Sequence, residues 1–459
     1  RLAGILGQAA GLDRGRHSIW AIRSFGLPGQ LQETPPSCRG TTAIDKGGMI
    51  IVASKSRTRN GRSALIRFLS LCVLALLIGC GGGLQPAAPS HDQGAPVVIQ
   101  FGSAWEEASP ADVGMEAGPI DRLIELLQTQ EHYYHSLLVV KDGKLVVEEY
   151  WGGQDADLTS YEFGLADPME FDHDTPHFQA SVTKSITSIL VGIAIDKGFL
   201  RGVDEKMFDF FPEYANLGTG GKEDLTVAHM LTMGTGIPWD ESYPYTDLRN
   251  DLARMWHDTD PIHVVLEMPV VAAPTTRFLY NSGTTNLLGE IVRRKTGMSL
   301  VEFAEHTLFA PLGISSYEWV GFEHDPEMAF ASSGLYLRPR DMAKVGQLYL
   351  QKGIWNGEQI VSREWVESSV ERWVSIPPSA RGADHASGYG YQWWLEEYDG
   401  GEIEAYSARG YGLQFIVVLP DLNMVVVFTG GAWSMSPFNV PLRYDRLIED
   451  YILPAVTEP

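Results

Sequence analysis

The sequence predicts an α/β (α+β) fold in which an antiparallel sheet of about five strands is flanked by helices. Three observations support this prediction: strand-like runs at both ends of the folded body, helical periodicity between them, and an Asp-Gly turn that joins two of the strands. Because strands from both ends share one sheet, a mostly helical domain is expected as an insertion at about residues 155–330. The folded domain as a whole is expected over 100–459.

A helix and a hairpin open the folded body. The helix is predicted by apolar residues at spacings of three and four: Ile120, Leu123, Ile124 and Leu127. The hairpin is expected over 136–140 and 145–150, because its Asp142-Gly143 pair suits the tight primed turns that join antiparallel strands.

The middle of the chain has helical signals. The most apolar helix is expected from Ser181 to Ile195, where apolar residues fill most positions after the first turn and predict burial on most sides. Another is expected from Pro339 through Leu350, since proline suits a first helical turn. Shorter helices are expected at 225–233, 286–294 and 300–308.

The C-terminal part changes to short apolar or aromatic runs separated by Gly, Asp and Pro, which is typical of strands and turns. Strands are expected at 391–395, 414–419 and 424–429, and a helical period closes the chain over 442–452.

The N-terminal region has the features of a processing signal. If Met49 is the start, a basic stretch precedes an apolar run over 68–78 that is too short for a comfortable membrane span. The run ends in Leu77-Ile78-Gly79-Cys80, which resembles a bacterial lipoprotein signal with Cys80 as the lipidated residue. The alternative is an ordinary signal peptide with a chance cysteine.

These features divide the N-terminal part into three segments. Residues 1–48 are interpreted as a non-native or upstream segment, 49–80 as a lipoprotein signal peptide, and 81–99 as a flexible tether. The expected location is therefore outside the cytoplasmic membrane, on the periplasmic side or cell surface, with contact to a membrane only through the anchor at Cys80.

Charge and cysteine content narrow the classes of partner. Residues 1–79 carry a net charge of +8 and the remainder −31, and a body this acidic repels phosphate backbones, so no nucleic-acid partner is expected. The three cysteines all precede residue 81, so the body is expected to fold without disulfides.

Ser181-Val182-Thr183-Lys184 places a hydroxyl at the start of the buried helix and an amine about one turn later on the same face. A serine hydroxyl is a poor nucleophile until a base takes its proton, and a lysine amine serves as base only when burial or nearby charge lowers its pKa. The apolar helix supplies burial, and its N-terminus favours a developing oxyanion. Since Ser-x-x-Lys occurs about once by chance in such a chain, the alternative is a capping serine and a solvent-exposed lysine.

Ordered blocks along nearly all of the body resemble the serine β-lactamase and penicillin-binding-protein superfamily, class C β-lactamases included. These blocks are the hairpin with Lys141-Asp142-Gly143, the Ser181 block through Gly198, and 226–236, 278–289, 334–350 and 410–429. The resemblance implies a β-lactamase/transpeptidase-like fold and a serine hydrolase that needs no cofactor. It also implies that Ser181 is the nucleophile and Lys184 its base.

The resemblance extends to a tyrosine motif, because Tyr280-Asn281-Ser282 is similar to the Tyr-x-Asn motif of this superfamily with Ser in the third position. It implies that Tyr280 shares the proton of Ser181 and passes it to the leaving group. The alternative for Tyr280 is a core tyrosine. Ser282 is expected to orient substrate or Lys184.

The third motif of this superfamily is a Lys-Thr-Gly or His-x-Gly strand, and the corresponding stretch here, 407–412, has neither Lys nor His. Arg409 either replaces that charge toward substrate or faces solvent. Gly410 and Gly412 are expected to let substrate approach the backbone, so the Tyr411 N–H is the expected oxyanion donor beside that of Ser181. This stretch is similar to the branch that holds carboxylesterases and linear-amide hydrolases such as 6-aminohexanoate-dimer hydrolase, which implies a small-molecule ester or amide substrate.

Other functions lack support in the sequence. No Gly-x-Ser-x-Gly elbow occurs, and no zinc motif predicts a metal site. Trp239 and Trp393 flank motif blocks, so each either lines the cleft or packs in the core. The alternatives to an esterase or amidase are a β-lactamase or D,D-peptidase and a non-catalytic sensor that acylates without turnover.

Overall fold

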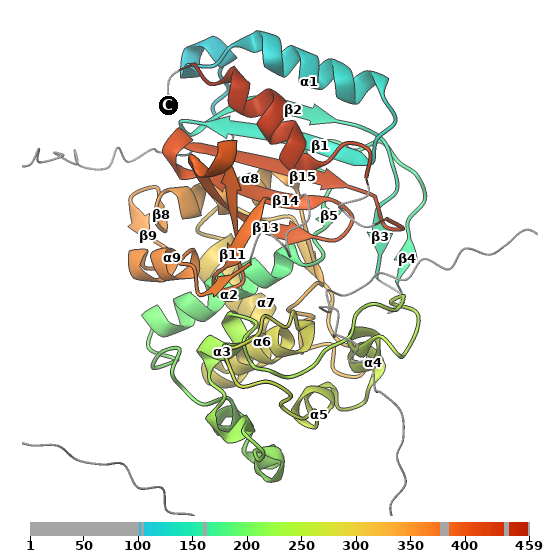
Figure 1. Ribbon diagram of the computed structural model, residues 1–459, viewed down its shortest axis with the longest axis vertical. Coiled ribbons are helices and arrows are strands. Elements are labelled where there is room, and N and C mark those ends of the chain that lie inside the picture. The colour runs from blue at the N-terminus through green and yellow to red at the C-terminus, as the bar shows by residue number, and fades with distance from the viewer. Residues whose placement is uncertain (1–100, 102–104, 159–162, 377–384, 436–439, 458–459) are drawn as a thin grey trace, which may run out of the picture. The chain divides into compact units, whose positions relative to one another are not determined.

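A computed structural model of the protein describes residue 101 and residues 105–457, apart from 159–162, 377–384 and 436–439 (Figure 1). The predicted upstream segment, signal peptide and tether, and with them Cys80, lie outside the described residues. None of the helices in the described part of the chain has both the length and the apolar composition that a membrane crossing needs.

The described residues form one large sheet whose neighbouring strands are all antiparallel, which confirms the predicted fold class. Its order is β10-β11-β12-β13-β14-β15-β1-β2. The strands are β1 (Tyr134–Lys141), β2 (Lys144–Tyr150), β10 (Val374–Ser375), β11 (Ala386–Tyr389), β12 (Trp394–Tyr398), β13 (Ile403–Gly410), β14 (Gln414–Leu419) and β15 (Met424–Gly430).

The sheet therefore has eight described strands where about five were predicted from the sequence. β10 and β11 are short and contain small polar residues, and β13 mixes small and charged residues with apolar ones, so none gives a continuous apolar run. The strand predicted at 391–395 begins later, at Trp394, because Gln392 has a φ of 65° and turns the chain just before it.

The hairpin predicted from the Asp-Gly turn is present as β1 and β2. Asp142 and Gly143 have φ values of 54° and 75°, as a primed turn requires. β1 also pairs with β15, from Lys141 opposite Met424 to Tyr134 opposite Gly430, so the two ends of the folded body meet at adjacent strands of the sheet.

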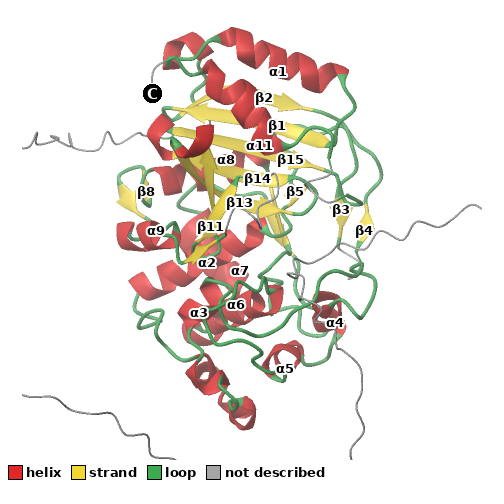
Figure 2. Ribbon diagram, viewed as in Figure 1, coloured by secondary structure: helices red, strands yellow, loops and turns green. Residues whose placement is uncertain are grey.

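Helices cover both faces of the sheet (Figure 2). On one face α1 (Ala117–Thr129) packs beside the C-terminal helix, which begins as α11 (Tyr444–Leu447) and continues with π-helical bonding over Ile448–Ile452. On the other face lie α8 (Pro339–Leu350) and α2 (Val182–Asp196). Alternate residues of each strand point to these two layers: Leu137 and Val139 to the first, Leu138 and Val140 to the second.

The remaining helices gather beyond α2 on the side away from α1 (Figure 1). They are α3 (Val227–Leu231), α4 (Asp251–His257), α5 (Pro261–Leu266), α6 (Ser282–Thr296) and α7 (Leu300–Ala304), with α9 (Arg363–Ser369) nearer the sheet. Three small sheets are separate from the large one: β3 (Ala156–Asp157) with β4 (Gly164–Leu165), β7 (Leu335–Leu337) between β5 (His177–Phe178) and β6 (Tyr317–Trp319), and β8 (Ile354–Trp355) with β9 (Glu358–Gln359). The helix α2 thus lies between the sheet and this helical part.

Candidate active site

Ser181 occupies the N-cap of α2, and the backbone just before it is strained. Ala180 has a φ of 44°, in a region that residues with a side chain seldom adopt. The Ser181 hydroxyl makes no capping hydrogen bond to the helix. The hydroxyl is therefore not used to hold α2 and is available to the groups around it.

Lys184 lies one turn further along α2 and contacts Ser181 directly. Its Nζ donates to Ser181 Oγ at 3.0 Å and to the backbone carbonyl of Ser332 at 3.0 Å. The side chain is 1% exposed. Burial lowers the pKa of the Lys184 amine from its ordinary 10.5 to about 8, and the negative charge of Glu241 opposes that shift. A neutral amine is thus accessible near neutral pH.

Tyr280 completes a group of three side chains. It comes directly before α6, whose N-cap is Asn281, and its ring lies under the Lys184 amine with 4.9 Å from Nζ to the ring centroid. Burial raises the pKa of the Tyr280 phenol well above its ordinary value, and a hydrogen bond with the Ser181 side chain opposes that rise. The phenol therefore keeps its proton in the resting protein, and Ser181, Lys184 and Tyr280 meet between the sheet and the helical part.

A pocket opens beside Ser181, and Tyr411 lies on its wall. Among the described residues it is lined by Leu158, Phe163, Phe178, Ala180, Ser181, Tyr245, Leu252, Ala253, Trp256, Phe330, Ser333 and Tyr411. Tyr411 directly follows the end of β13, so this strand end and Ser181 border the same pocket.

The two glycines of this strand end serve the protein's own packing. A side chain at Gly410 would collide with the backbone carbonyl of Gln179, two residues before Ser181. Gly412 has a φ of 82°, and a side chain there would collide with the ring of Trp433. These contacts explain why both positions are glycine, and the expectation that Gly410 and Gly412 let substrate approach the backbone stays a prediction.

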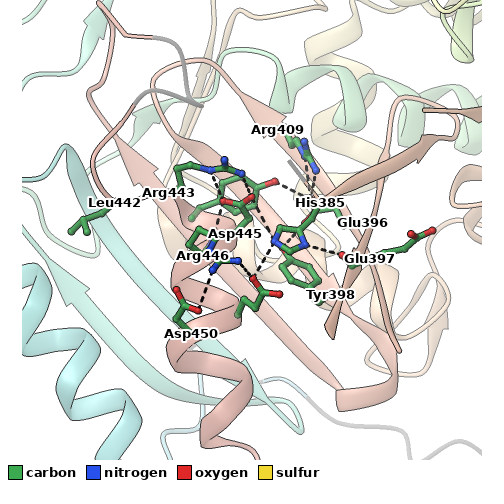
Figure 3. Close-up of polar contacts among 12 residues, drawn as sticks. His385, Glu396, Glu397, Tyr398, Arg409, Leu442, Arg443, Asp445, Arg446 and Asp450 are labelled. Atoms are coloured by element: carbon green, nitrogen blue, oxygen red, sulfur yellow. Dashed lines mark hydrogen bonds and ion pairs between the residues drawn. The ribbon is translucent and has the colours of Figure 1, made fainter. Parts of the chain in front are cut away.

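Arg409 points away from Ser181, because successive residues of a strand face opposite sides of a sheet. Its neighbour Ala408 packs in the cluster that contains α2, while the Arg409 guanidinium lies 2.9 Å from the buried carboxylate of Glu396. Figure 3 shows this pair within polar contacts that extend to His385 and Asp445. The interpretation of Arg409 as a substrate-binding or solvent-facing cation is thus corrected.

This ion pair predicts a stability effect. The Glu396 side chain is fully buried and also accepts from Ser407, Tyr398 and Tyr444, so Glu396→Ala removes the carboxylate that pairs with the buried Arg409 guanidinium and breaks a buried polar network. Urea unfolding is expected to show a loss of about 3–5 kcal/mol. Glu404→Ala, an exposed position on the same strand β13, is the control and should change stability by less than about 0.5 kcal/mol. Equal losses in the two variants would contradict this account.

The two tryptophans that flank the motif blocks lie in different places. Trp393 is fully buried and stacks on Tyr349 of α8 with 4.3 Å between ring centroids, so it belongs to the core and not to the cleft. Trp239 is partly buried, packs over Gly283 at the start of α6, and donates from Nε1 to Glu241 at 2.6 Å. It does not line the pocket beside Ser181 in the described part of the chain.

Ser282 has a different environment from the one predicted. Its hydroxyl is buried and has no hydrogen-bond partner among the described residues, and its backbone N–H donates to Glu241 at 3.3 Å. The predicted role of orienting Lys184 is filled here by the carbonyl of Ser332.

Sequence reasoning missed Glu241 and Tyr245. Glu241 accepts from Trp239 and from the first turn of α6, and its charge acts on the pKa values of both Lys184 and Tyr280. Burial raises the pKa of the Tyr245 phenol, and the negative charge of Glu241 raises it further. Both residues lie in the loop between α3 and α4, which has no periodicity. The one available signal is the run of acidic and aromatic residues that directly follows the motif block at 226–236.

Comparison with known proteins agrees with this geometry. Residues 121–434 match the family model described as Beta-lactamase. The chain belongs to the Beta-lactamase family. This member is 26% identical to the 6-aminohexanoate-dimer hydrolase of Paenarthrobacter ureafaciens over 332 residues, which cover 68% of this chain and 77% of that protein.

Two solved structures share the fold of this Beta-lactamase family member. The octameric penicillin-binding protein homologue from Pyrococcus abyssi matches with a TM-score of 0.55 at 20% identity, covering 74% of this chain and 77% of that one. A family VIII carboxylesterase matches with a TM-score of 0.55 at 18% identity, covering 73% and 96%. Family membership and these relatives identify the protein as a serine hydrolase of the β-lactamase and penicillin-binding-protein superfamily.

Proposed function

We propose that this enzyme hydrolyses a small ester or linear amide through a covalent acyl-enzyme on Ser181. The observation that carries the proposal is the 3.0 Å contact between Lys184 Nζ and Ser181 Oγ in a buried site where the pKa of the lysine is lowered to about 8. A lysine in this state can accept a proton from serine, which a solvated lysine does not do at neutral pH.

The reaction follows from this arrangement. Neutral Lys184 takes the proton of Ser181 as Oγ forms a bond to the substrate carbonyl carbon, and the backbone N–H groups of Ser181 and Tyr411 hold the oxyanion. Tyr280, whose phenol lies near the Ser181 side chain and whose ring is adjacent to Lys184, relays the proton to the leaving alcohol or amine as the bond from that group to carbon breaks. Water then attacks the acyl-enzyme, and the same groups return a proton to Ser181.

The charges around the site favour esters and linear amides over β-lactams and peptidoglycan peptides. A substrate carboxylate needs a cation, but the β13 residue that faces α2 is Ala408 and the Arg409 guanidinium is paired with Glu396. The Glu241 carboxylate near Lys184 and Tyr280 repels a second carboxylate. The names of the relatives, a linear-amide hydrolase and a carboxylesterase, support the same choice.

A parallel assay tests this preference. We expect sustained hydrolysis of p-nitrophenyl acetate or butyrate, and hydrolysis of nitrocefin with a kcat/KM lower by at least about 100-fold, since a missing charge partner costs roughly 3 kcal/mol. A single stoichiometric burst with the ester and no turnover would favour a non-catalytic sensor. Nitrocefin turnover equal to ester turnover would favour a β-lactamase.

Tyr280→Phe tests the proton relay. The substitution keeps the ring under Lys184 and removes only the hydroxyl that contacts Ser181, so the fold should remain. We expect kcat for an ester with a poor leaving group, such as ethyl butyrate, to fall about 10²–10⁴-fold. The p-nitrophenyl ester should lose much less, because p-nitrophenolate leaves without a proton. Equal losses for both esters would argue against leaving-group protonation by Tyr280.

We also propose that the protein is exported and anchored through a lipid on Cys80. The Leu77-Ile78-Gly79-Cys80 pattern after a basic and apolar run supports this. Labelling of the expressed protein with radioactive palmitate, lost in Cys80→Ser, tests the proposal, and unchanged labelling in that variant would refute it.

A further inference from the structure

The pocket beside Ser181 has a mostly apolar wall. Its deep part is formed by Leu158, Phe178, Leu252, Trp256 and Phe330, each at most 3% exposed. Trp256 and Phe330 stack with 5.1 Å between ring centroids and an angle of 13° between ring planes, so this part is preformed. A pocket of this kind binds hydrocarbon or aromatic groups by removing them from water.

The few polar atoms of the wall already have partners. The Tyr411 phenol donates to the carbonyl of Trp433, Trp256 Nε1 donates to the carbonyl of Gly321 at 3.3 Å, and the Ser333 hydroxyl lies 3.4 Å from that of Ser332. None of the described residues that line the pocket carries a charge. The Glu241 carboxylate lies outside the wall and already accepts from Trp239 Nε1 and from the backbone N–H of Ser282, so a charged group on a ligand would find no charged residue on the pocket wall itself.

The position of the proton-transfer groups shows which part of a substrate enters the pocket. Ser181 is on the pocket wall, whereas Lys184 and Tyr280 are not among the residues that line it. The leaving group must lie on the side of Lys184 and Tyr280 to receive its proton. The acyl part then extends from the Ser181-bound carbonyl in the other direction, into the pocket.

We infer that this pocket binds the acyl chain of the substrate and selects uncharged, apolar acyl groups. Substrates whose acyl chain ends in an amine or a carboxylate should therefore be poor substrates of this enzyme. The inference rests on the proposed function, because it takes Ser181 as the nucleophile. It goes further by naming the substrate class: esters or linear amides of aliphatic or aromatic acids.

A series of p-nitrophenyl esters tests this inference. From acetate to hexanoate, kcat/KM is expected to rise about fourfold for each methylene that is buried. The heptanoate and 6-aminohexanoate esters have acyl chains of the same length and differ in a terminal methyl or ammonium group. We expect the ammonium ester to react at least about 100-fold more slowly, because its charge loses water in a pocket whose described wall has no charged residue.

Two variants of α4 locate the selectivity in the pocket. Ala253→Leu fills the pocket and should lower kcat/KM for hexanoate by at least about tenfold while changing acetate by less than about threefold. Leu252→Ala enlarges it and should move the preferred chain length upward. Leu248→Ala, at an exposed position in the loop before α4, is the control and should leave the length profile unchanged. A folding defect would lower all esters alike, acetate included.

The outcomes separate this inference from the proposed function. Hydrolysis of acetate with no dependence on chain length, or equal rates for heptanoate and 6-aminohexanoate, overturns the acyl pocket and leaves the serine hydrolase standing. Absence of hydrolysis for every ester, with no fluorophosphonate labelling of Ser181, overturns both. A length-dependent profile that shifts in opposite directions in the two α4 variants supports the pocket.

Discussion

Ser181→Ala is expected to abolish turnover of p-nitrophenyl esters and covalent labelling by a fluorophosphonate. The substitution removes the oxygen that forms the acyl-enzyme, and Lys184 and Tyr280 have no other hydroxyl in contact that could replace it in the described residues. Thermal unfolding should change little, because the Ser181 hydroxyl makes no capping hydrogen bond to α2 and Lys184 keeps the Ser332 carbonyl as an acceptor.

Ser185→Ala is the matched control on the same helix. Its hydroxyl is buried and donates to the carbonyl of Gln392 at 2.6 Å, outside the group of three. Its loss should reduce stability by about 1 kcal/mol and leave labelling of Ser181 intact. Labelling of Ser181→Ala at an unchanged rate would mean that another residue is the nucleophile.

Lys184→Met is expected to lower the acylation rate by about 10²–10⁴-fold, because it removes the base while filling nearly the same apolar volume. In the wild-type enzyme the amine acts as a base only when neutral. The acylation rate should therefore rise with pH through about 8, the pKa to which burial lowers Lys184, and level off above it. The measurement is single-turnover acylation by a p-nitrophenyl ester between pH 6 and 10, within the range in which the variant is shown to be folded.

The same lysine links pH to stability. Between about 8 and its ordinary value of 10.5, the unfolded chain holds a proton on Lys184 that the folded chain has lost, so the unfolding free energy rises with pH across this window. Lys184→Met should remove that rise. For Lys184→Met, an acylation rate within about threefold of wild type corresponds to a change of less than about 1 kcal/mol in activation free energy. Such a rate, together with an unchanged pH profile, would show that Lys184 is not the base.

Local spacing explains why part of the site could be predicted. Ser181 and Lys184 are one helical turn apart, so a buried helix alone brings them into contact. Tyr280 could not be placed by spacing, and its place in the site was expected only from the resemblance of its motif. Ser332 contributes a backbone carbonyl, which no residue type reveals.

Arg409 in β13 and Trp393 just before β12 could not be placed from the sequence, for two different reasons. The direction of a strand side chain depends on register, and a shift of one residue exchanges the two faces of a sheet. Without the pairing of β13 with β14, Arg409 and Ala408 could not be assigned to faces. Trp393 lies in the core, and the backbone turns at Gln392 just before it. A positive φ at a glutamine cannot be predicted from the sequence pattern.

The fold class was predictable because strand and helix signals occur in long, separate blocks. The strand number was not, because β10, β11 and β13 are held by their neighbours in the sheet and not by their own composition. Glu241 and Tyr245 were missed for a related reason: their loop is held by contacts of side chains, from Asn250 to the Tyr243 carbonyl and from Glu241 to the distant Ser282, and such contacts leave no periodic pattern in the sequence.

The pairing of β1 with β15 constrains how the protein is made. A ribosome releases the β1–β2 hairpin and the apolar helix α2 long before β13, β14 and β15, yet these late strands supply the neighbours that cover them. The apolar surface of α2 therefore stays exposed, and open to aggregation, until synthesis is nearly complete. Pairing β1 with β15 also closes a loop of most of the folded body, which makes folding slow. A chain truncated before residue 403 lacks the strands that complete the sheet, and it is expected to be captured by chaperones or degraded instead of forming a smaller enzyme.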